Sequence, residues 1–285
     1  MRLKSSRAFS FVAVALIYVI CIFVGVGQYG YLPFSTPINL LIADTAATVA
    51  CFIFSLVFKN SSVYDPYWSV APIVIVIGYA IGNGLTTISA MVLIAVCFWG
   101  IRLTANWAYT FHGLCHQDWR YTMLCEKTGK FYPIINFIGI HYVPTLVVYG
   151  CILPAVCVIE YKPEINLLSI IFISFSFLAA IMQGVADIQM HKFRKNRTGA
   201  FIRAGLWKNS RHPNYLGEIL MWWGVGISAV CAMPDRWYLI FGAVANTLLF
   251  LCVSIPMADG RQSKKEGFEE YKRETRMLLP IRKFK

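Results

Sequence analysis

The sequence predicts an all-α membrane protein, a polytopic helical bundle with about seven to eight transmembrane helices. Of its 285 residues, 58% are hydrophobic and only 14% are charged, whereas a soluble domain is about 45–50% apolar. Long apolar runs such as 241–253 favour helices that face lipid. Apolar and polar residues do not alternate as they do in strands, which argues against an outer-membrane barrel.

Eight segments have the apolar length of about 20 residues that a helix needs to cross a bilayer. The third candidate is short and the fifth is long. No repeat, linker or change of composition divides the chain, so we expect a single integral-membrane domain over residues 1–285. The candidates lie at about 9–29, 38–58, 67–83, 86–108, 133–159, 166–190, 214–233 and 236–256.

The first span and the cysteines each have a simple interpretation. A basic segment precedes the first span, but the apolar stretch runs for about 20 residues and no small-residue cleavage site follows, so we expect a retained anchor.

The nine cysteines are scattered, without a C-x-x-C pair or a Cys/His cluster at metal spacing. We interpret them as small core residues and expect no metal.

The distribution of charge predicts the orientation of the chain. A net charge of +12 would suggest nucleic acid in a soluble protein. With a cytosolic N-terminus, however, 23 of the 26 basic residues are cytosolic, as the positive-inside rule expects. Eight passes put both termini in the cytosol. We therefore expect contacts with membrane lipids and an anionic cofactor, and no nucleic acid. The membrane would be the endoplasmic reticulum in a eukaryote and the inner membrane in a bacterium.

The segment 25–30 matches the dinucleotide-binding pattern G-x-G-x-x-G. That pattern binds pyrophosphate only as a turn from a strand into a helix, whereas this segment ends a predicted membrane span. We interpret its glycines as small residues that allow close helix packing.

Six ionisable residues fall within the predicted spans or at their edges, where a charge at mid-bilayer costs about 2.5–3.5 kcal/mol. All except Asp44 lie within about two helical turns of the cytosolic boundary. This common depth predicts a site at the cytosolic ends of the helices, while Asp44 is interpreted as a buried polar contact between helices. The six are Asp44, Asp65, Arg102, Asp187, Glu218 and Asp259.

Two helices supply the candidate side chains. Gln183, Asp187, His191 and Arg194 follow the spacing i, i+4, i+8 and i+11, which places them on one helical face that leads into a basic loop. Such a stripe predicts contact with a ligand or with another helix.

The next predicted helix begins at Pro213 and carries Asn214 and Glu218 one turn apart. Because its neighbours are apolar, we expect the Glu218 carboxyl to stay neutral and to act as a hydrogen-bond donor or general acid. The alternative is an ion pair of Glu218 with Arg102 or Arg211 that holds two helices together.

The run Ser-Arg-His-Pro-Asn-Tyr-Leu-Gly-Glu at 210–218 resembles the steroid 5-alpha-reductase superfamily, and in particular its poorly characterised branch. The resemblance is specific over 181–280 and looser in segments 64–68, 99–103 and 118–121, and residues 1–60 lie outside its strongest part. It implies a helical intramembrane fold and NADPH that enters from the cytosol. It also implies hydride transfer to a carbon–carbon double bond conjugated to a carbonyl, in a steroid-like or other lipid.

The resemblance assigns roles to residues of this sequence. Glu218 matches the glutamate that polarises the substrate carbonyl, and Asp65 stands in for a second acidic residue of the substrate pocket, so these two are the catalytic candidates. The cofactor-binding candidates are Gln183, Asp187, Arg194, Arg211, Asn214, Arg261 and Arg102.

Two departures from the family pattern affect the prediction. Trp99 stands where the steroid enzymes have their catalytic tyrosine, so the substrate need not be a steroid. In the tail, 257–261 replaces a basic, His-containing segment, which leaves Arg261 as the credible phosphate ligand there.

Two other functions stay open. An S-adenosylmethionine-dependent methyltransferase of the isoprenylcysteine or phospholipid type shares the pattern Arg-His-Pro-x-Tyr-x-Gly, although its tail carries paired acids where this chain has Asp259 and Gly260. A non-enzymatic lipid-binding membrane protein could keep the fold without turnover, and Trp99 is the main argument for it.

Overall fold

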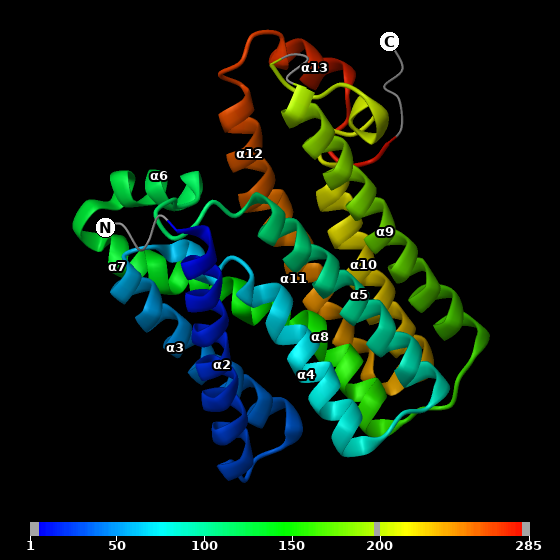
Figure 1. The fold of residues 1–285 in the computed structure, drawn as a ribbon. Helices are drawn as coiled ribbons and strands as arrows, with labels where there is room; N and C mark the ends of the chain where they lie inside the picture. Colours follow the sequence, from blue (N-terminus) through cyan, green and yellow to red (C-terminus); the bar gives the residue numbers. More distant parts are fainter. Residues whose placement is uncertain (1–5, 197–199, 281–285) are drawn as a thin grey trace. The chain divides into compact units, whose positions relative to one another are not determined.

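A computed structural model describes residues 6–196 and 200–280 (Figure 1). Within these residues the chain is helical, without strands apart from one isolated bridge between Ser210 and Arg276. Eight helical segments are long and apolar enough to cross a membrane, which confirms the predicted all-α polytopic membrane fold. They are Arg7–Tyr31, Thr36–Phe58, Ser61–Asn83, Thr87–Thr110, Trp119–Tyr161, Leu167–Asn196, Pro213–Ala232 and Pro234–Gln262.

The fifth span is longer than predicted because it contains several helical segments. It begins with α6 (Trp119–Thr128), whose N-cap Asp118 accepts a hydrogen bond from the backbone N–H of Arg120. A short 3₁₀ turn, α7 (Tyr132–Ile135) and a π-helical segment, η3 (Asn136–Tyr142), lead to α8 (Val143–Tyr161). A π-helical segment widens the turn and is frequent at functional sites.

Contacts along the chain form two compact units. The first unit contains 6–82 and 100–153, and the second unit contains 83–99 and 154–280. Helix α5 (Thr87–Thr110) contributes to both, with the boundary after Trp99. The expectation of a single domain stays a prediction.

The first unit begins with α2 (Arg7–Tyr31), which packs along α3 (Thr36–Phe58). The segment 25–30 lies inside α2, so it forms no strand-to-helix turn and the G-x-G-x-x-G match is a coincidence. A Cβ added at Gly25 would lie 3.5 Å from the Ala47 Cβ, as expected for close helix packing, whereas one added at Gly27 or Gly30 would meet nothing within 4 Å, so the packing interpretation is wrong for those two. The short helix η1 (Ser61–Tyr64) and α4 (Tyr67–Asn83) follow.

The second unit is built on α9 (Leu167–Asn196) and α10 (Pro213–Ala232), which run side by side (Figure 1). Two glycines of α10 permit this contact. A Cβ at Gly217 would lie 2.7 Å from the Gln183 Cβ, and one at Gly224 would lie 2.5 Å from the Ser176 Cβ. The chain continues through η5 (Pro234–Ile240), α11 (Phe241–Leu249), π-helical η6 (Phe250–Ser254), α12 (Ile255–Gln262) and α13 (Phe268–Glu274).

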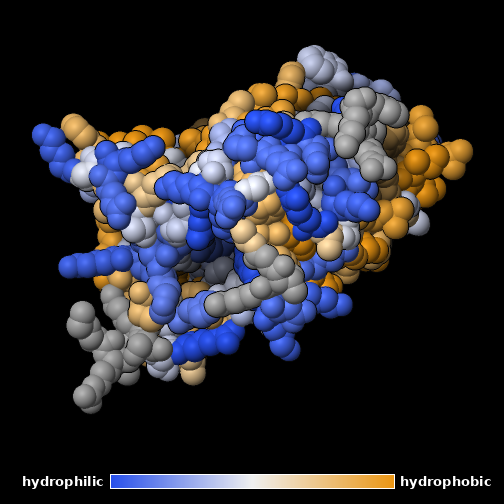
Figure 2. All heavy atoms as spheres, turned by 90° about the horizontal axis from the view of Figure 1, so that it is seen from above, coloured by the Kyte–Doolittle hydropathy of each residue, from blue (hydrophilic) through white to orange (hydrophobic). Residues whose placement is uncertain are grey.

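Hydrophilic residues gather on the face seen in Figure 2, which carries the end of the second unit where α13 lies, and hydrophobic residues border it. All nine cysteines are free thiols. The prediction that they are core residues is correct for the four buried ones, Cys21, Cys51, Cys151 and Cys157, whereas Cys115, Cys125 and Cys252 are exposed.

Candidate functional site

The centre of the candidate site is the Glu218 carboxyl of α10, which is 2% exposed. Three N–H groups donate to it. Trp99 Nε1 lies 2.8 Å and Gln183 Nε2 lies 2.7 Å from Oε2. Trp222 Nε1, one turn further along α10, lies 2.9 Å from Oε1. Glu218 therefore connects α5, α9 and α10 within the second unit.

Glu218 accepts a hydrogen bond in each of these three contacts. Several N–H donors stabilise a charged carboxylate, and a neutral carboxyl can also accept them while its own O–H donates elsewhere. The role of Glu218 in polarising a carbonyl or as a general acid therefore stays a prediction. The alternative ion pair with Arg211 does not form, because Arg211 pairs with Asp259.

Two acid–amide pairs join α9 to α10. In one pair Gln183 donates to Glu218, and in the other Asn214 Nδ2 lies 3.5 Å from Asp187 Oδ1, at the limit of a hydrogen bond. A carboxylate accepts only from the nitrogen of an amide, so each pair fixes which end of the amide is the oxygen. The predicted sharing of one helical face by Gln183 and Asp187 is confirmed, because both belong to the single helix α9.

Each pair leaves one buried amide oxygen unsatisfied. Among the residues that the structure describes, no donor reaches Gln183 Oε1 or Asn214 Oδ1. A buried carbonyl oxygen without a donor costs about 1–3 kcal/mol. The two oxygens are thus ready acceptors for N–H groups of a ligand.

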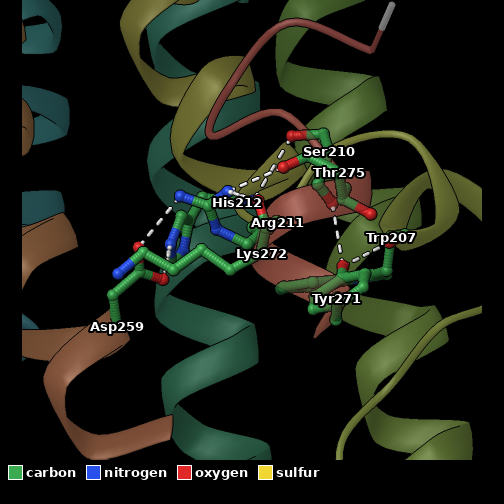
Figure 3. Close-up of polar contacts among 8 residues, drawn as sticks. All are labelled: Trp207, Ser210, Arg211, His212, Asp259, Tyr271, Lys272 and Thr275. Carbon is green, nitrogen blue, oxygen red and sulfur yellow. Dashed lines mark hydrogen bonds and ion pairs between the residues drawn. The ribbon is translucent and has the colours of Figure 1, made fainter. Parts of the chain in front are cut away.

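The start of α10 is tied to the tail by a buried ionic cluster (Figure 3). Asp259 Oδ2 lies 3.0 Å from Arg211 Nη2, and Asp259 Oδ1 lies 2.9 Å from His212 Nε2. Arg211 Nη1 also donates to the backbone carbonyl of Thr275 at 2.7 Å. The His212 ring stacks on Tyr215, with centroids 5.2 Å apart.

Tyr271 of α13 provides a second link to this region (Figure 3). Its hydroxyl donates to the backbone carbonyl of Trp207. Burial raises the pKa of Tyr271 to about 12, so the phenol stays protonated and able to donate at neutral pH. The tail is therefore fastened both to Arg211 and to the loop before α10.

Arg211 is 8% exposed, and both of its terminal nitrogens bond within the protein. A phosphate would have to displace Asp259 or the Thr275 carbonyl to bind there. These bonds hold the tail, while Arg211 Nε has no acceptor among the described residues. The predicted cofactor contact of Arg211 stays a prediction.

Three other basic residues remain accessible. Arg194 at the end of α9, Arg261 on α12 and Lys265 after it are exposed. Partial burial, followed by the positive charges of Arg261 and Arg194, lowers the pKa of Lys265, so both arginines act on this lysine, whose ammonium donates to the Ala200 carbonyl at 2.7 Å. We call them the basic cluster. It brings together two residues predicted to contact phosphate, Arg194 and Arg261, and adds Lys265.

An open pocket of about 650 Å³ lies beside the end of α9. Lys192, Phe193 and Asn196 of α9 line it together with the loop 200–205 and residues 266–267. Arg203 on its wall donates to the Gly267 carbonyl at 3.1 Å and lies over the Phe201 ring.

The remaining candidates belong to the first unit. The Asp65 carboxyl accepts a 2.6 Å hydrogen bond from the Tyr121 hydroxyl, and Arg120 beside it pairs with Asp118 at 2.8 Å. Arg102 of α5 is half-buried. The roles of Asp65 and Arg102 in a common site with Glu218 stay predictions.

Two partnerships were not predicted from the sequence. Trp99 is a donor to Glu218 as well as a departure from the family pattern, and Asp259 has Arg211 and His212 as partners. The available signal was the pair Arg211 and His212 directly before the helix start at Pro213, because neighbouring positive charges at a helix N-terminus attract a carboxylate. In the described part of the chain, no group of three or more His, Cys, Asp or Glu side chains could hold a metal ion.

Fold and site together define a polytopic, all-α integral membrane protein with a buried acid–amide site between two helices. A family model described as "Protein of unknown function (DUF1295)" matches residues 51–275, and the chain belongs to this family. No curated protein and no solved structure matches the chain.

Proposed function

We propose that this protein is an NADPH-dependent reductase of a carbon–carbon double bond conjugated to a carbonyl in a steroid-like or other lipid. The observation that carries the proposal is the pair of buried amide oxygens, Gln183 Oε1 and Asn214 Oδ1, which have no donor among the described residues. A carboxamide N–H₂, such as that of nicotinamide, supplies the donors that they need. The resemblance of 181–280 to the steroid 5-alpha-reductase superfamily supports the same assignment.

The basic cluster supports an anionic cofactor. Arg194 lies eleven residues after Gln183 on the same helix, about 16 Å along its axis, a separation that an extended dinucleotide can bridge. Arginine and lysine bind phosphate groups as bidentate and point-charge partners. In this proposal Arg194, Arg261 and Lys265 hold the phosphates, and both termini and the cofactor entrance are cytosolic.

NADPH, when bound, supplies the hydride. The residues of the chain bind the cofactor and the substrate and orient them. Glu218 is a positioning residue that holds the Gln183 amide and two indole rings, and the helical bundle excludes water from the site. Asp65 keeps the role of substrate-pocket acid that the resemblance implies.

Ligand-dependent stability tests the cofactor. Purified protein in detergent is heated with NADPH, NADH or S-adenosylmethionine, because a ligand at a hundred times its dissociation constant stabilises by about 2.7 kcal/mol. We expect NADPH to raise the Tm most. A rise with S-adenosylmethionine alone would favour the methyltransferase and end the reductase proposal.

Variants then locate the binding site. Gln183→Ala and Asn214→Ala are expected to weaken the NADPH-dependent shift, whereas Glu164→Gln, in an exposed loop, serves as the control and keeps it. An unchanged shift in both site variants would show that the amide oxygens do not bind the cofactor.

Turnover is measured with NADPH and a panel of lipid enones, with the gain of two hydrogen atoms detected by mass spectrometry. Binding of NADPH without reduction of any enone would leave the lipid-binding function as the better explanation.

A further inference from the structure

A second polar site lies in the first unit, away from the residues used above. Five side chains contribute oxygens to it, and we call them the oxygen cluster. Hydrogen bonds connect them: Tyr67 Oη to Asp44 Oδ1 at 2.9 Å, Tyr64 Oη to Thr145 Oγ1 at 2.8 Å, and Thr48 Oγ1 to Thr145 Oγ1 at 3.0 Å. The two groups adjoin, because the Tyr64 and Tyr67 rings stack with their centroids 5.2 Å apart.

The cluster is assembled from four helical segments. Asp44 and Thr48 lie one turn apart on α3, Tyr64 ends η1, Tyr67 begins α4, and Thr145 lies on α8 just after the π-helical segment η3. All five residues are buried; Asp44 is 8% exposed and Thr48 is fully buried. The predicted polar contact of Asp44 between helices is confirmed, but it is one part of a larger group.

The charge of Asp44 is not balanced within the protein. In the described part of the chain, no Lys, Arg or His side chain pairs with Asp44, and the Tyr67 hydroxyl is the side-chain donor that reaches it. A buried carboxylate in a membrane protein must be paired, protonated or bound to a cation, because its desolvation is too costly otherwise.

The hydroxyls near Asp44 favour a cation as the third possibility. The Tyr67 hydroxyl contacts the carboxyl directly, and the hydroxyls of Tyr64, Thr145 and Thr48 form a hydrogen-bonded group of their own. Hydroxyl and carboxylate oxygens are hard ligands, and hydroxyl hydrogens can rotate away so that several oxygens face one cation. In transporters, buried oxygen groups beside irregular helical turns bind sodium ions.

We propose that the oxygen cluster is a binding site for a small monovalent metal cation such as sodium, with Asp44 as its charged ligand. The site does not depend on the reductase function, and its occupancy would stabilise the contacts among α3, α4 and α8. Protons compete for the same carboxylate. The titratable groups that face Asp44 or its neighbours include Tyr18, Tyr64, Tyr67, Cys51 and His141.

The test is the thermal stability of the full chain in detergent, with sodium chloride compared with choline chloride at equal ionic strength and neutral pH. We expect sodium to raise the Tm, with a saturating dependence on its concentration. Acidification should reduce the sodium effect. Equal Tm values in the two salts would overturn the proposal, and a Tm that rises on acidification regardless of sodium would indicate a protonated carboxyl instead.

Two variants and a control locate the effect. Asp44→Asn should abolish the sodium-dependent rise, and Thr48→Val should shift it to several-fold higher sodium concentration while keeping the side-chain volume. Asp235→Asn, at an aspartate whose side chain is 78% exposed, should leave it unchanged. If sodium still raises the Tm of both cluster variants as it does for the unmodified protein, the proposed site is wrong. If Asp44→Asn does not fold, the result for Thr48→Val tests the proposal alone.

Discussion

The indole Nε1 of Trp99 donates a 2.8 Å hydrogen bond to Oε2 of Glu218, across 119 positions of the sequence. Trp99 is fully buried, and its ring packs edge-on against Trp222, which donates to the other carboxyl oxygen. The residue that departs from the steroid-reductase pattern is therefore a direct partner of the central acid of the site.

Replacing Trp99 tests this partnership. Trp99→Phe removes the donor, which costs about 1–3 kcal/mol, and leaves a cavity smaller than that of a change to alanine, which costs about 3–5 kcal/mol. Trp99→His keeps a ring N–H and is expected to recover part of that loss. Thermal unfolding in detergent measures both. Equal destabilisation by the two substitutions would mean that packing, and not the hydrogen bond, is what Trp99 contributes.

The ion pair between Arg211 and Asp259 leads to a second prediction. Asp259→Asn leaves Arg211 buried without a counter-charge, which costs about 3–5 kcal/mol. Because this pair fastens the tail to the start of α10, we also expect faster proteolysis within 260–280. Limited proteolysis followed by mass spectrometry measures the rate.

The control for this experiment is Asp235→Asn, which removes an exposed aspartate 3.8 Å from Arg236. Exposed pairs contribute about 0–1 kcal/mol, so its unfolding and proteolysis should match the unmodified protein. Equal behaviour of the Asp259 and Asp235 variants would refute the role of the cluster in holding the tail.

Features set by local sequence were predictable, and those set by distant contacts were not. Hydropathy located the eight spans because each span is a continuous run, and helical spacing put Gln183 and Asp187 on one face because that relation lies within one helix. The Pro213 helix start was readable for the same reason.

Partners across the fold escaped sequence reasoning. Asp259 lies 47 and 48 positions from His212 and Arg211, and apolar composition says nothing about which donor reaches which acid. The expectation for Glu218 rested on its apolar neighbours in sequence, which give no sign of the three N–H groups that donate to the carboxyl in the structure. The fifth predicted span, 133–159, lies within the helical segment Trp119–Tyr161, and the added α6 carries charged residues, so the apolar run did not include it.

Close packing of α9 against α10 gives a third prediction. Gly224→Ala would add a Cβ 2.5 Å from the Ser176 Cβ and 2.9 Å from the Phe172 carbonyl oxygen. Forcing extra volume into a packed contact costs about 1–3 kcal/mol. Gly78→Ala, in α4 with nothing within 4 Å of its added Cβ, is the matched control and should be neutral or slightly stabilising in the same thermal assay. A neutral Gly224→Ala would mean that the two helices separate easily.

Tyr271 gives a prediction for alkaline pH. Burial raises its pKa to about 12, above the value of about 10 in an unfolded chain. The neutral phenol therefore contributes stability that is complete below pH 10 and is lost as the pH rises through 12. Two pKa units correspond to about 2.7 kcal/mol, so the unmodified protein should lose roughly this much more than Tyr271→Phe between these limits.

The decisive quantity is the difference in unfolding free energy between the unmodified protein and Tyr271→Phe. Contributions from other tyrosines are common to both proteins and cancel in this difference. Chemical or thermal unfolding at several pH values from neutral to alkaline gives it directly. Tyr271→Phe is expected to start less stable, since the Trp207 carbonyl loses its donor, and the gap should close as the pH rises. A gap that stays constant would show that the Tyr271 phenol does not ionise in the folded protein over this range, or that its hydrogen bond to Trp207 contributes nothing.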